Sequence, residues 1–552
     1  MSAPNSLNKL GSLTSRIILY AVTSIFVISL AHAETKCEKV PQVEITQNAI
    51  TINGHKTMLR AVSYSLPKSW DGSSIELAEI DHDLAAIKAA GFNAVRSYEP
   101  WPEEVLDLIE LRSLYLVEAV VHIDDSTNFD SDEEANEVIA RALSIVARDR
   151  CRPSIVLWSL WNDAPFNWGT SGGNAVSRYG YPVINSFLRR LYDAVKERNP
   201  ERYITGANVL NARHAEVGMD VVDVIGVNAY LGIYDWLTQS YSQALAEDLV
   251  FRLKALSKKY GKPIWISEMG AASVPAPLEP TYFIPQQIEL VQKGGFFGYS
   301  IFQWRDDWSK VGPASEAPFH IEANWGLLDA RRQRKAGFRY IAAAVSGIKE
   351  QNPILAETRI AWHEIPSSPC LPAMTCETLD NFSYADSGEL RRAYGKKHLG
   401  YAHAFLTQAK AEQDGRPALK IRFVPEDFGA WLLISRTLTH AIDARRFQNI
   451  TVRLATAGAP MNVSVTVKLR DGRVFRSLPL LISNTQMKTY LLPLKGMLLD
   501  WVSNGHARIF DPTLLSLNGT VVDIGFRIND VANFEAPGVP AEILVEHIEL
   551  RG

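Results

Sequence analysis

Short apolar segments alternate with amphipathic segments from about residue 45 to about residue 350. The apolar segments predict buried strands, and amphipathic segments such as Asp81–Ala90, Asp132–Arg148 and Ala244–Tyr260 predict helices. The predicted strands are Met58–Tyr64, Asn93–Tyr98, Tyr115–Ile123, Ser154–Trp161, Tyr203–Ala207, Val222–Tyr230, Pro263–Ser267 and Gly298–Trp304. Eight strand–helix units fit a closed (β/α)8 TIM barrel better than an open doubly wound sheet, because no glycine-rich phosphate turn follows any of these strands.

The hydrophobic pattern changes after residue 350, where we expect the barrel domain (residues 34–350) to end. A proline-rich stretch predicts a linker over residues 351–376, and short alternating runs follow over residues 377–552. The predicted strands there are Ala418–Phe423, Ala430–Leu438, Asn449–Ala455, Asn462–Leu469, Lys488–Pro493, Val521–Arg527 and Glu542–Glu549. Regular short strands separated by turn residues predict an all-β sandwich of the jelly-roll kind.

An apolar run near the N-terminus is typical of a secretory signal peptide. Lys9 and Arg16 precede the run Ile17–Leu30, which ends in the small-residue sequence Ala31-His32-Ala33. The run is short for a bilayer span, which needs about 20 residues; an uncleaved anchor is the alternative. We therefore predict a signal peptide over residues 1–33, no membrane span after its cleavage, and a secreted or periplasmic protein.

The chain contains four cysteines, and export would place them in an oxidising compartment. Their spacing matches no zinc signature, so we expect disulfides. Cys370 and Cys376 are close enough in sequence to close a small loop, which leaves Cys37 and Cys151 as a second pair. In a barrel, both members of the second pair precede strands and belong to the N-terminal face, where a bond would stabilise the fold.

The charge of the chain is nearly balanced, with 57 basic residues, 61 acidic residues and a formal net charge of −4. Binding to nucleic-acid phosphates requires a basic face, so no nucleic-acid partner is predicted. A metal-dependent barrel would need clustered His and Asp at the strand ends, where only His122 and His320 come near. We therefore predict neither a metal site nor a cofactor.

Polar and aromatic residues gather where the predicted barrel strands end, which is where barrel enzymes carry their chemistry. These ends read Ser63-Tyr64, Arg96-Ser97-Tyr98-Glu99, His122, Trp161-Asn162-Asp163, Asn208, Asn228-Ala229-Tyr230, Glu268 and Gln303-Trp304-Arg305-Asp306. The carboxyl groups of Asp163 and Glu268 follow strands on opposite sides of the ring. Two opposed carboxyls are what cleavage of a glycosidic bond requires, one to protonate the leaving oxygen and one to attack or to activate water.

Several segments of the barrel then resemble a known family in the right order. They are Ile52-Asn53-Gly54-His55-Lys56, Gly91-Phe92-Asn93-Ala94-Val95-Arg96-Ser97, Ser154 to Asp163, Lys262-Pro263-Ile264-Trp265-Ile266-Ser267-Glu268 and Trp325-Gly326-Leu327-Leu328-Asp329. The sequence resembles the catalytic barrels of retaining glycoside hydrolases of clan A and is most similar to the family 2 barrel of β-galactosidases, β-glucuronidases and β-mannosidases. The β-sandwich domains that usually precede that barrel have no counterpart in this sequence.

The resemblance implies roles for individual residues. Glu268 would be the nucleophile, oriented by Arg96 and Tyr230, while Asn162 would bind the 2-hydroxyl of the sugar and Trp304 would line the sugar-binding floor. Tyr98 and Asn228, at strand ends, and Trp168, in the loop after Asp163, are further candidate substrate contacts, although that loop fits an ordinary surface loop equally well. Asp306, Asp307, Trp308 and His320 are weaker pocket candidates.

The acid/base position departs from the family pattern, because Asn162 is followed by Asp163 where the family has glutamate. The aspartate side chain is one methylene shorter, so its carboxyl lies up to about 1.5 Å further back. Three outcomes are open: the loop moves to compensate, Asp163 is a poor acid/base, or another residue such as Glu99 supplies the proton.

The sequence therefore predicts an exported glycosidase that hydrolyses or transfers β-linked glycans through Glu268, with an oligo- or polysaccharide as its partner. The alternative is a catalytically weakened barrel that binds polysaccharide in envelope or matrix assembly. The C-terminal domain resembles carbohydrate-binding jelly-roll modules, particularly at Val545–Leu550. Trp431 or Trp501 would be a glycan platform on its surface, unless both belong to the core.

Overall fold

The structure is a computed structural model. It describes residues 37, 40–67, 76–123, 127–163, 175–209, 216–235, 240–241, 243–273, 280–310, 320–350, 362–367, 370, 374–400, 402–411, 415–425, 431–457, 461–477, 479–502, 517–528 and 540–552. The predicted signal peptide lies outside these residues and stays a prediction. Among the described residues, no helix combines the length and the apolar character needed to cross a bilayer.

Eight parallel strands close into a barrel in the order β12-β13-β4-β5-β6-β7-β8-β9. They are β4 (Leu59–Ser63), β5 (Ala94–Arg96), β6 (Tyr115–Ala119), β7 (Ile155–Asn162), β8 (Tyr203–Val209), β9 (Val224–Asn228), β12 (Ile264–Met269) and β13 (Gly298–Ile301). Each corresponds to one predicted strand, so the predicted TIM barrel is confirmed. A small antiparallel sheet precedes the barrel and consists of β1 (Val43–Thr46), β2 (Ala49–Ile52) and β3 (His55–Thr57).

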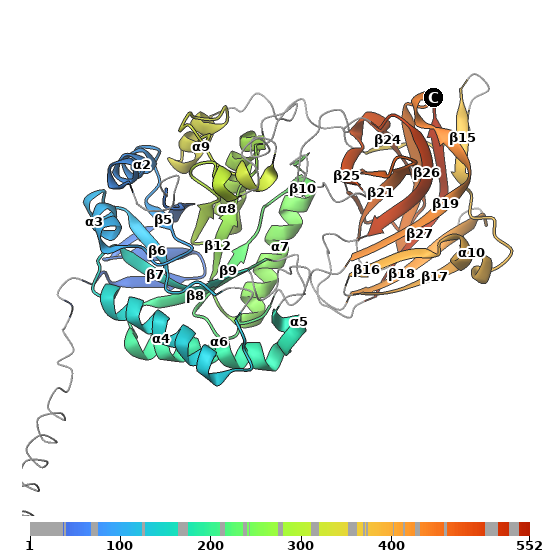
Figure 1. Cartoon of the computed structure of the whole chain (residues 1–552). Helices are drawn as coiled ribbons and strands as arrows, with labels where there is room; N and C mark the ends of the chain where they lie inside the picture. Colours follow the sequence, from blue (N-terminus) through green and yellow to red (C-terminus); the bar gives the residue numbers. More distant parts are fainter. Residues whose placement is uncertain are drawn as a thin grey trace, which may run out of the picture. The chain divides into compact units, whose positions relative to one another are not determined.

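Helices follow the strands and pack against the outside of the barrel (Figure 1). They are α2 (Leu77–Ala89), α3 (Glu103–Leu111), α4 (Asp132–Asp149), α5 (Ala175–Tyr179), α6 (Tyr181–Arg198), α7 (Gln243–Tyr260), α8 (Ile284–Gly294) and α9 (Phe338–Val345). The start of α4 shows how local sequence fixes where a helix begins. The Ser131 hydroxyl accepts a hydrogen bond from the Glu134 backbone N–H, and three acidic residues occupy the first helical turn.

Strand β7 carries the acid/base candidate to the edge of the barrel. Every residue from Ile155 to Trp161 is buried, as expected for a parallel strand covered on both faces. The Trp161 indole donates to the Asn208 Oδ1 atom at 2.9 Å, and a Cβ on Gly206 would lie only 2.1 Å from the Trp161 ring. Trp161 is therefore a core residue, and the missing side chain of Gly206 makes room for it.

The C-terminal domain is a sandwich of two antiparallel sheets, as predicted. One sheet contains β14 (His363–Ile365), β24 (Lys488–Pro493), β20 (Asn449–Ala457), β27 (Ala541–Arg551), β18 (Pro417–Pro425), β17 (Ala402–Lys410) and β15 (Cys376–Asp380). The other contains β16 (Lys396–Gly400), β19 (Trp431–Asp443), β26 (Thr520–Ile528), β21 (Met461–Leu469), β22 (Arg473–Arg476), β25 (Leu498–Val502) and β23 (Leu480–Ile482). The helix α10 (Ser387–Ala393) and the strands β14, β15, β16, β17, β22, β23 and β25 are additions to the predicted elements.

Of the two tryptophans proposed as glycan platforms, the structure describes the side chain of Trp431 only. Trp431 is partly buried, and the Arg527 guanidinium lies over its ring, 5.0 Å from the centroid. The Trp431 ring is therefore already covered on one face by a cation. The side chain of Trp501 lies outside the described residues.

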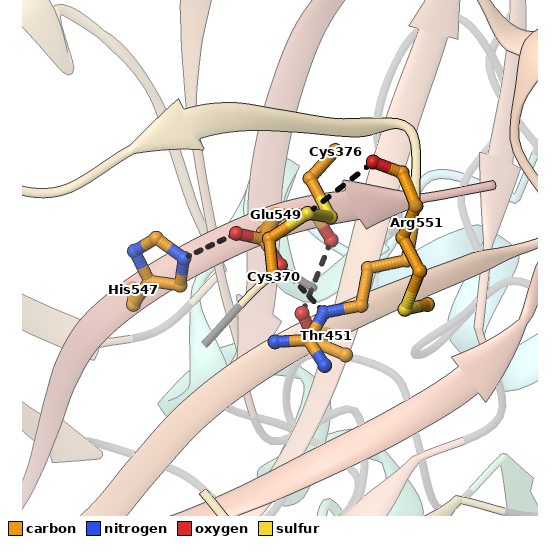
Figure 2. The surroundings of a disulfide bond; sticks show 7 residues. Cys370, Cys376, Thr451, His547, Glu549 and Arg551 are labelled. Atoms are coloured by element: carbon orange, nitrogen blue, oxygen red, sulfur yellow. Dashed lines mark hydrogen bonds and ion pairs between the residues drawn. A yellow bond between two sulfur atoms is a disulfide. The ribbon is translucent and has the colours of Figure 1, made fainter. Parts of the chain in front are cut away.

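A disulfide joins Cys370 to Cys376, as the sequence predicts. Figure 2 shows this bond beside the last strand of the sandwich, where Cys376 pairs in register with Arg551 of β27. The Glu549 carboxylate lies next to it and accepts from Arg551 at 2.5 Å. The bond fastens the end of the linker to the sandwich. Cys37 and Cys151 are also disulfide-bonded, and no free cysteine occurs among the described residues.

Candidate active site

The Glu268 side chain lies at the carboxyl end of β12 and is only 5% exposed. The Arg96 guanidinium, at the end of β5, donates from Nη1 to Glu268 Oε1 at 2.9 Å and to the Ser267 carbonyl at 2.7 Å. Arg96 itself is 1% exposed, so this ion pair is almost fully shielded from water. A buried guanidinium in direct contact holds the Glu268 carboxyl in place at the mouth of the barrel, as the position of a nucleophile requires.

Two tyrosines complete the shell around the Glu268 carboxylate. Tyr98 donates to Oε1 at 2.7 Å, and Tyr230 donates to Oε2 at 2.8 Å. Burial, together with the neighbouring Glu268 charge, raises the pKa of both phenols well above its usual value. Both tyrosines therefore stay neutral and keep donating. The sequence predicted Tyr98 as a sugar contact, whereas the structure places its hydroxyl on the nucleophile candidate.

Asp163 has a different environment. Among the described residues, its Oδ1 atom accepts one side-chain hydrogen bond, from Asn228 Nδ2 at 2.7 Å. Burial and, after it, the negative charge of Glu268 raise the pKa of Asp163 from 3.8 to about 8, although Asn228 and Arg96 oppose the change. Asp163 is therefore protonated near neutrality, as a general acid must be.

The backbone at Asp163 is also unusual, since its φ angle is +31°. Residues other than glycine rarely adopt positive φ values, but aspartate does so several times more often than most. The Asp163 backbone N–H donates to the Ala207 carbonyl on β8 at 2.9 Å, which holds this conformation in place. A short side chain that tolerates positive φ thus occupies the position where the family has glutamate.

Asn228 at the end of β9 links the two carboxyl groups. Its Oδ1 atom accepts from the Ser267 hydroxyl at 2.7 Å, and its Nδ2 atom donates both to Asp163 and, at 3.0 Å, to Asn162 Oδ1. Asn162 Oδ1 also accepts from Arg96 Nη2 at 2.6 Å. The side-chain oxygen of Asn162 thus already accepts two hydrogen bonds. Its NH2 group makes no hydrogen bond to a described residue and is available to a ligand hydroxyl.

The role predicted for Trp304 is wrong. Its ring is 1% exposed and meets Phe92 and Phe338 edge to face, at centroid distances of 6.4 Å and 6.0 Å. Trp304 therefore belongs to the core between barrel and helices and offers no open face to a sugar. The sequence argument failed because β13 ends at Ile301, so strand alternation does not fix the direction of a side chain three residues later.

Other aromatic rings enclose the carboxylate instead. Phe302 contacts Tyr98 and Trp325 at centroid distances of 5.9 Å and 5.8 Å, and Trp325 contacts Tyr230 at 4.9 Å. These four residues form an aromatic wall that includes two of the Glu268 donors. Trp325 begins one of the segments that carry the family resemblance, so a signal for it was present in the sequence. No comparable signal marked Phe302.

The weaker pocket candidates mostly have structural contacts. Asp306 Oδ1 accepts from the Gly326 N–H and from Lys335, both at 2.7 Å, and so anchors the segment that carries Trp325. Burial raises the pKa of Asp306 to about 6 in spite of Lys335. Asp307 accepts from Ser309, His320 accepts from the Glu322 N–H, and Trp308 is partly buried. Trp168 lies outside the described residues.

Glu99, the alternative proton donor, is exposed and makes no hydrogen bond or ion pair with a described residue. Asp163, in contrast, shares Asn228 with the network around Glu268 and is influenced electrostatically by that carboxylate. The geometry therefore favours Asp163 over Glu99 as the acid. In the described part of the chain, no group of three or more His, Cys, Asp or Glu side chains is arranged to hold a metal ion.

A closed (β/α)8 barrel that places an arginine-paired carboxyl and a second carboxyl at the ends of its strands has the features that glycosidic cleavage requires. Residues 43–298 match the family model described as glycosyl hydrolases family 2, TIM barrel domain. The barrel of this chain is therefore similar to the barrels of that family over slightly less than half of the chain.

Individual relatives match only in part. A β-glucuronidase of Paenibacillus borealis is 25% identical over 247 residues, which cover 42% of this chain and 38% of that protein. A β-galactosidase of Bacteroides ovatus is 26% identical over 206 residues, or 33% of this chain and 24% of that protein. Among solved structures, a Faecalibacterium prausnitzii β-glucuronidase aligns at 20% identity with a TM-score of 0.44, covering 56% of this chain and 52% of that one. The chain thus spans less than two fifths of the length of these two curated relatives.

The raised pKa of Asp163 predicts that Asp163→Asn stabilises the fold at neutral and alkaline pH. The unfolded chain loses the proton near pH 3.8 and the folded chain only near pH 8, so wild-type stability falls as pH rises between these values. An asparagine escapes this penalty, while its Oδ1 atom still accepts from Asn228. At pH 7.5 we expect a gain of at most about 5 kcal/mol in the free energy of unfolding by urea, because each pH unit above 3.8 is worth about 1.4 kcal/mol, and the gain should shrink towards pH 4.

Asp307→Asn is the matched control, because Asp307 lies near the same end of the barrel and outside the carboxyl pair. It should change stability equally at both pH values. A gain for Asp163→Asn that is the same at pH 4 and pH 7.5 would contradict a protonated, desolvated Asp163.

Proposed function

We propose that this protein is a β-glycosidase that acts with retention of anomeric configuration, with Glu268 as nucleophile and Asp163 as acid/base. The observation that carries the proposal is the unequal environment of the two carboxyls. Glu268 receives a buried guanidinium and two phenol donors, whereas Asp163 receives one amide donor and is protonated near neutrality. Environments that push two neighbouring carboxyls to opposite protonation states suit one to attack and the other to donate a proton.

In the first step, a Glu268 oxygen forms a bond to the anomeric carbon as the bond from that carbon to the leaving oxygen breaks. The Asp163 proton passes to the leaving oxygen, so the aglycone departs neutral and Asp163 becomes a carboxylate. In the second step, Asp163 takes a proton from water, whose oxygen attacks the anomeric carbon. The electron pair of the ester bond then returns to Glu268. The free NH2 group of Asn162 is placed to donate to the sugar hydroxyl next to the reacting carbon.

The substrate we propose is a β-linked oligo- or polysaccharide. The relatives named above act, by their names, on β-glucuronides and β-galactosides, which supports a β-linked hexose or hexuronic acid at the bond that is cleaved. We further propose that the protein works outside the cytoplasm, because of the signal-peptide pattern over residues 1–33.

The second candidate function is a catalytically weakened barrel that binds polysaccharide. The shorter side chain of Asp163 and its positive φ angle favour it, since both alter the reach of the acid towards the leaving oxygen. Retaining enzymes hold their carboxyls about 5–5.5 Å apart, so a withdrawn carboxyl slows protonation of the leaving group more than attack by Glu268.

Mechanism-based labelling separates the two functions. The protein is incubated with dinitrophenyl 2-deoxy-2-fluoro β-glycosides of glucuronic acid, galactose, glucose and mannose, and the peptides are then mapped by mass spectrometry. A dinitrophenyl group leaves without acid assistance, so label on Glu268 is expected even if Asp163 is a weak acid. Absence of label with every sugar, alongside retained binding of polysaccharide, would support the binding function instead.

A further inference from the structure

A chain of hydroxyl groups leads through the barrel to Glu268. The Ser300 hydroxyl on β13 lies 2.9 Å from the Ser63 hydroxyl on β4, and Ser63 lies 3.0 Å from the phenol of Tyr98. Tyr98 lies 2.7 Å from Glu268 Oε1. Both serines are completely buried, whereas Tyr98 is partly buried.

The donors and acceptors in this chain have only one consistent order. An ionised Glu268 carboxylate only accepts, so the single Tyr98 proton points to Oε1. The Tyr98 oxygen must then accept from Ser63, and it also accepts from Arg96 Nη1 at 3.2 Å. Since the Ser63 hydroxyl uses its one hydrogen to donate to Tyr98, its oxygen must accept from Ser300. The direction is therefore Ser300 to Ser63 to Tyr98 to Glu268.

The two oxygens of Glu268 are consequently unequal. Oε1 accepts from Arg96 and from the end of the hydroxyl chain, whereas Oε2 accepts, among the residues that the structure describes, from Tyr230. Each hydroxyl that accepts a hydrogen bond becomes a stronger donor, so the chain strengthens the Tyr98 contact beyond that of an isolated phenol. Oε2 is left as the oxygen with more available electron density.

We propose that Ser300, Ser63 and Tyr98 form a one-way hydroxyl chain that positions Glu268 through Oε1 and makes Oε2 the attacking oxygen. This inference rests on the proposed glycosidase function for its catalytic consequence. During attack, the new bond joins Oε2 to the anomeric carbon, and Oε1 becomes the ester carbonyl. When water later breaks that ester, the returning charge is stabilised at Oε1, so the chain assists Glu268 as a leaving group.

Four groups with a charge or an ionisable proton face the Glu268 carboxyl, and a serine substitution should act through one of them only. Arg96 approaches from the end of β5 and Asp163 from the end of β7, while Tyr98 and Tyr230 supply the two phenols. Of these, Tyr98 alone connects to the serines. Removing a serine hydroxyl therefore changes the donor strength of Tyr98 while the charges of Arg96 and Asp163 stay in place.

The test is a graded series, Tyr98→Phe, Ser63→Ala and Ser300→Ala, with Ser63→Thr as the variant that restores a hydroxyl. Loss of a donor destabilises the carboxylate and raises the pH at which Glu268 ionises. We expect the acid limb of kcat/KM to move upward by about one pH unit for Tyr98→Phe, since a hydrogen bond to a charged group is worth about a tenfold step. The shift should be smaller for Ser63→Ala, smaller again for Ser300→Ala, and absent for Ser63→Thr.

Tyr299→Phe is the matched control. Tyr299 is buried on the same strand as Ser300, and its hydroxyl has no hydrogen-bond partner in the structure. It should leave the acid limb in place. Equal shifts for Tyr299→Phe and Tyr98→Phe, or serine variants that titrate like the wild type, would overturn the hydroxyl chain.

A second readout does not depend on turnover. Isotope-labelled glutamate carboxyls are titrated by NMR in the free protein, and the Glu268 resonance is assigned by its loss in Glu268→Gln. The same upward order, Tyr98→Phe above Ser63→Ala above Ser300→Ala, is expected even if the protein cleaves no glycoside. Absence of label on Glu268 would then reject the proposed function. A titration series in which the variants do not follow this order would reject the hydroxyl chain.

Discussion

Glu268→Gln is expected to reduce kcat/KM for a β-glycoside by at least about 10⁴-fold, because the amide cannot form or release the glycosyl ester. The side chain keeps its size, its amide oxygen can still accept from Arg96 and Tyr98, and its NH2 group can donate to the Tyr230 hydroxyl, so the fold should persist. The measurement is steady-state kinetics with an aryl β-glycoside, together with urea unfolding to confirm that the variant is folded.

Glu99→Gln is the control for this change. Glu99 lies at the same end of the barrel but is exposed, and it makes no hydrogen bond to Asp163 or to Glu268 in the described part of the chain. Its replacement should leave kcat/KM within about twofold, as expected for an exposed side chain outside the reacting pair. If Glu99→Gln and Glu268→Gln lose activity to a similar degree, the assignment of the nucleophile by burial and hydrogen bonding is wrong. If Glu268→Gln keeps most of the activity, retention through Glu268 is excluded.

Asp163→Asn is expected to show a loss of activity that depends on the leaving group. With a methyl glycoside, whose leaving oxygen needs a proton, kcat/KM should fall about 10²–10⁴-fold. With a dinitrophenyl glycoside, whose leaving group departs as an anion, the first step should fall by less than about tenfold. The same variant is expected to be more stable than the wild type at neutral pH, so loss of activity would not reflect unfolding.

The pH profile gives an independent check on Asp163. The protonated form is the active acid, so wild-type kcat/KM should decline as pH rises through about 8. In Asp163→Asn this descending limb should disappear, and exogenous azide should restore turnover by replacing the missing base in the second step. A descending limb that survives in the variant would assign the acid to another residue. Asp163→Glu then measures how much the shorter side chain lowers kcat/KM. A large increase in kcat/KM would show that the carboxyl of Asp163 lies too far from the leaving oxygen.

The carboxyl pair shows how far the sequence alone reaches. The two acids, the arginine and the tyrosine after β9 were predicted because parallel strands in a barrel end at one face, whatever the details of packing. That rule places Arg96, Asp163, Tyr230 and Glu268 together without any knowledge of side-chain directions, and the structure gives the predicted pairs Arg96–Glu268 and Tyr230–Glu268 as hydrogen bonds.

The sequence did not predict the direction of side chains that lie just beyond the end of a strand. Tyr98 was predicted to contact sugar and instead donates to Glu268, while Trp304 was predicted to face sugar and instead packs against Phe338. Both residues lie beyond the end of their strand, since β5 ends at Arg96 and β13 ends at Ile301, and the alternation of side chains no longer holds there. The direction of such a side chain depends on contacts with segments far away in sequence, such as the one that carries Trp325.

The sequence by itself predicted the barrel, the sandwich and the placement of Asp163 and Glu268 at the same end of the barrel, because the periodicity of strands and their order can be read along the chain. Only the tertiary structure decided that the pKa of Asp163 is raised. That shift depends on the burial of Asp163 and on its distances from Glu268, Asn228 and Arg96. Charge interactions and desolvation act through space, so a residue far away in the sequence, such as Glu268, changes the pKa of Asp163.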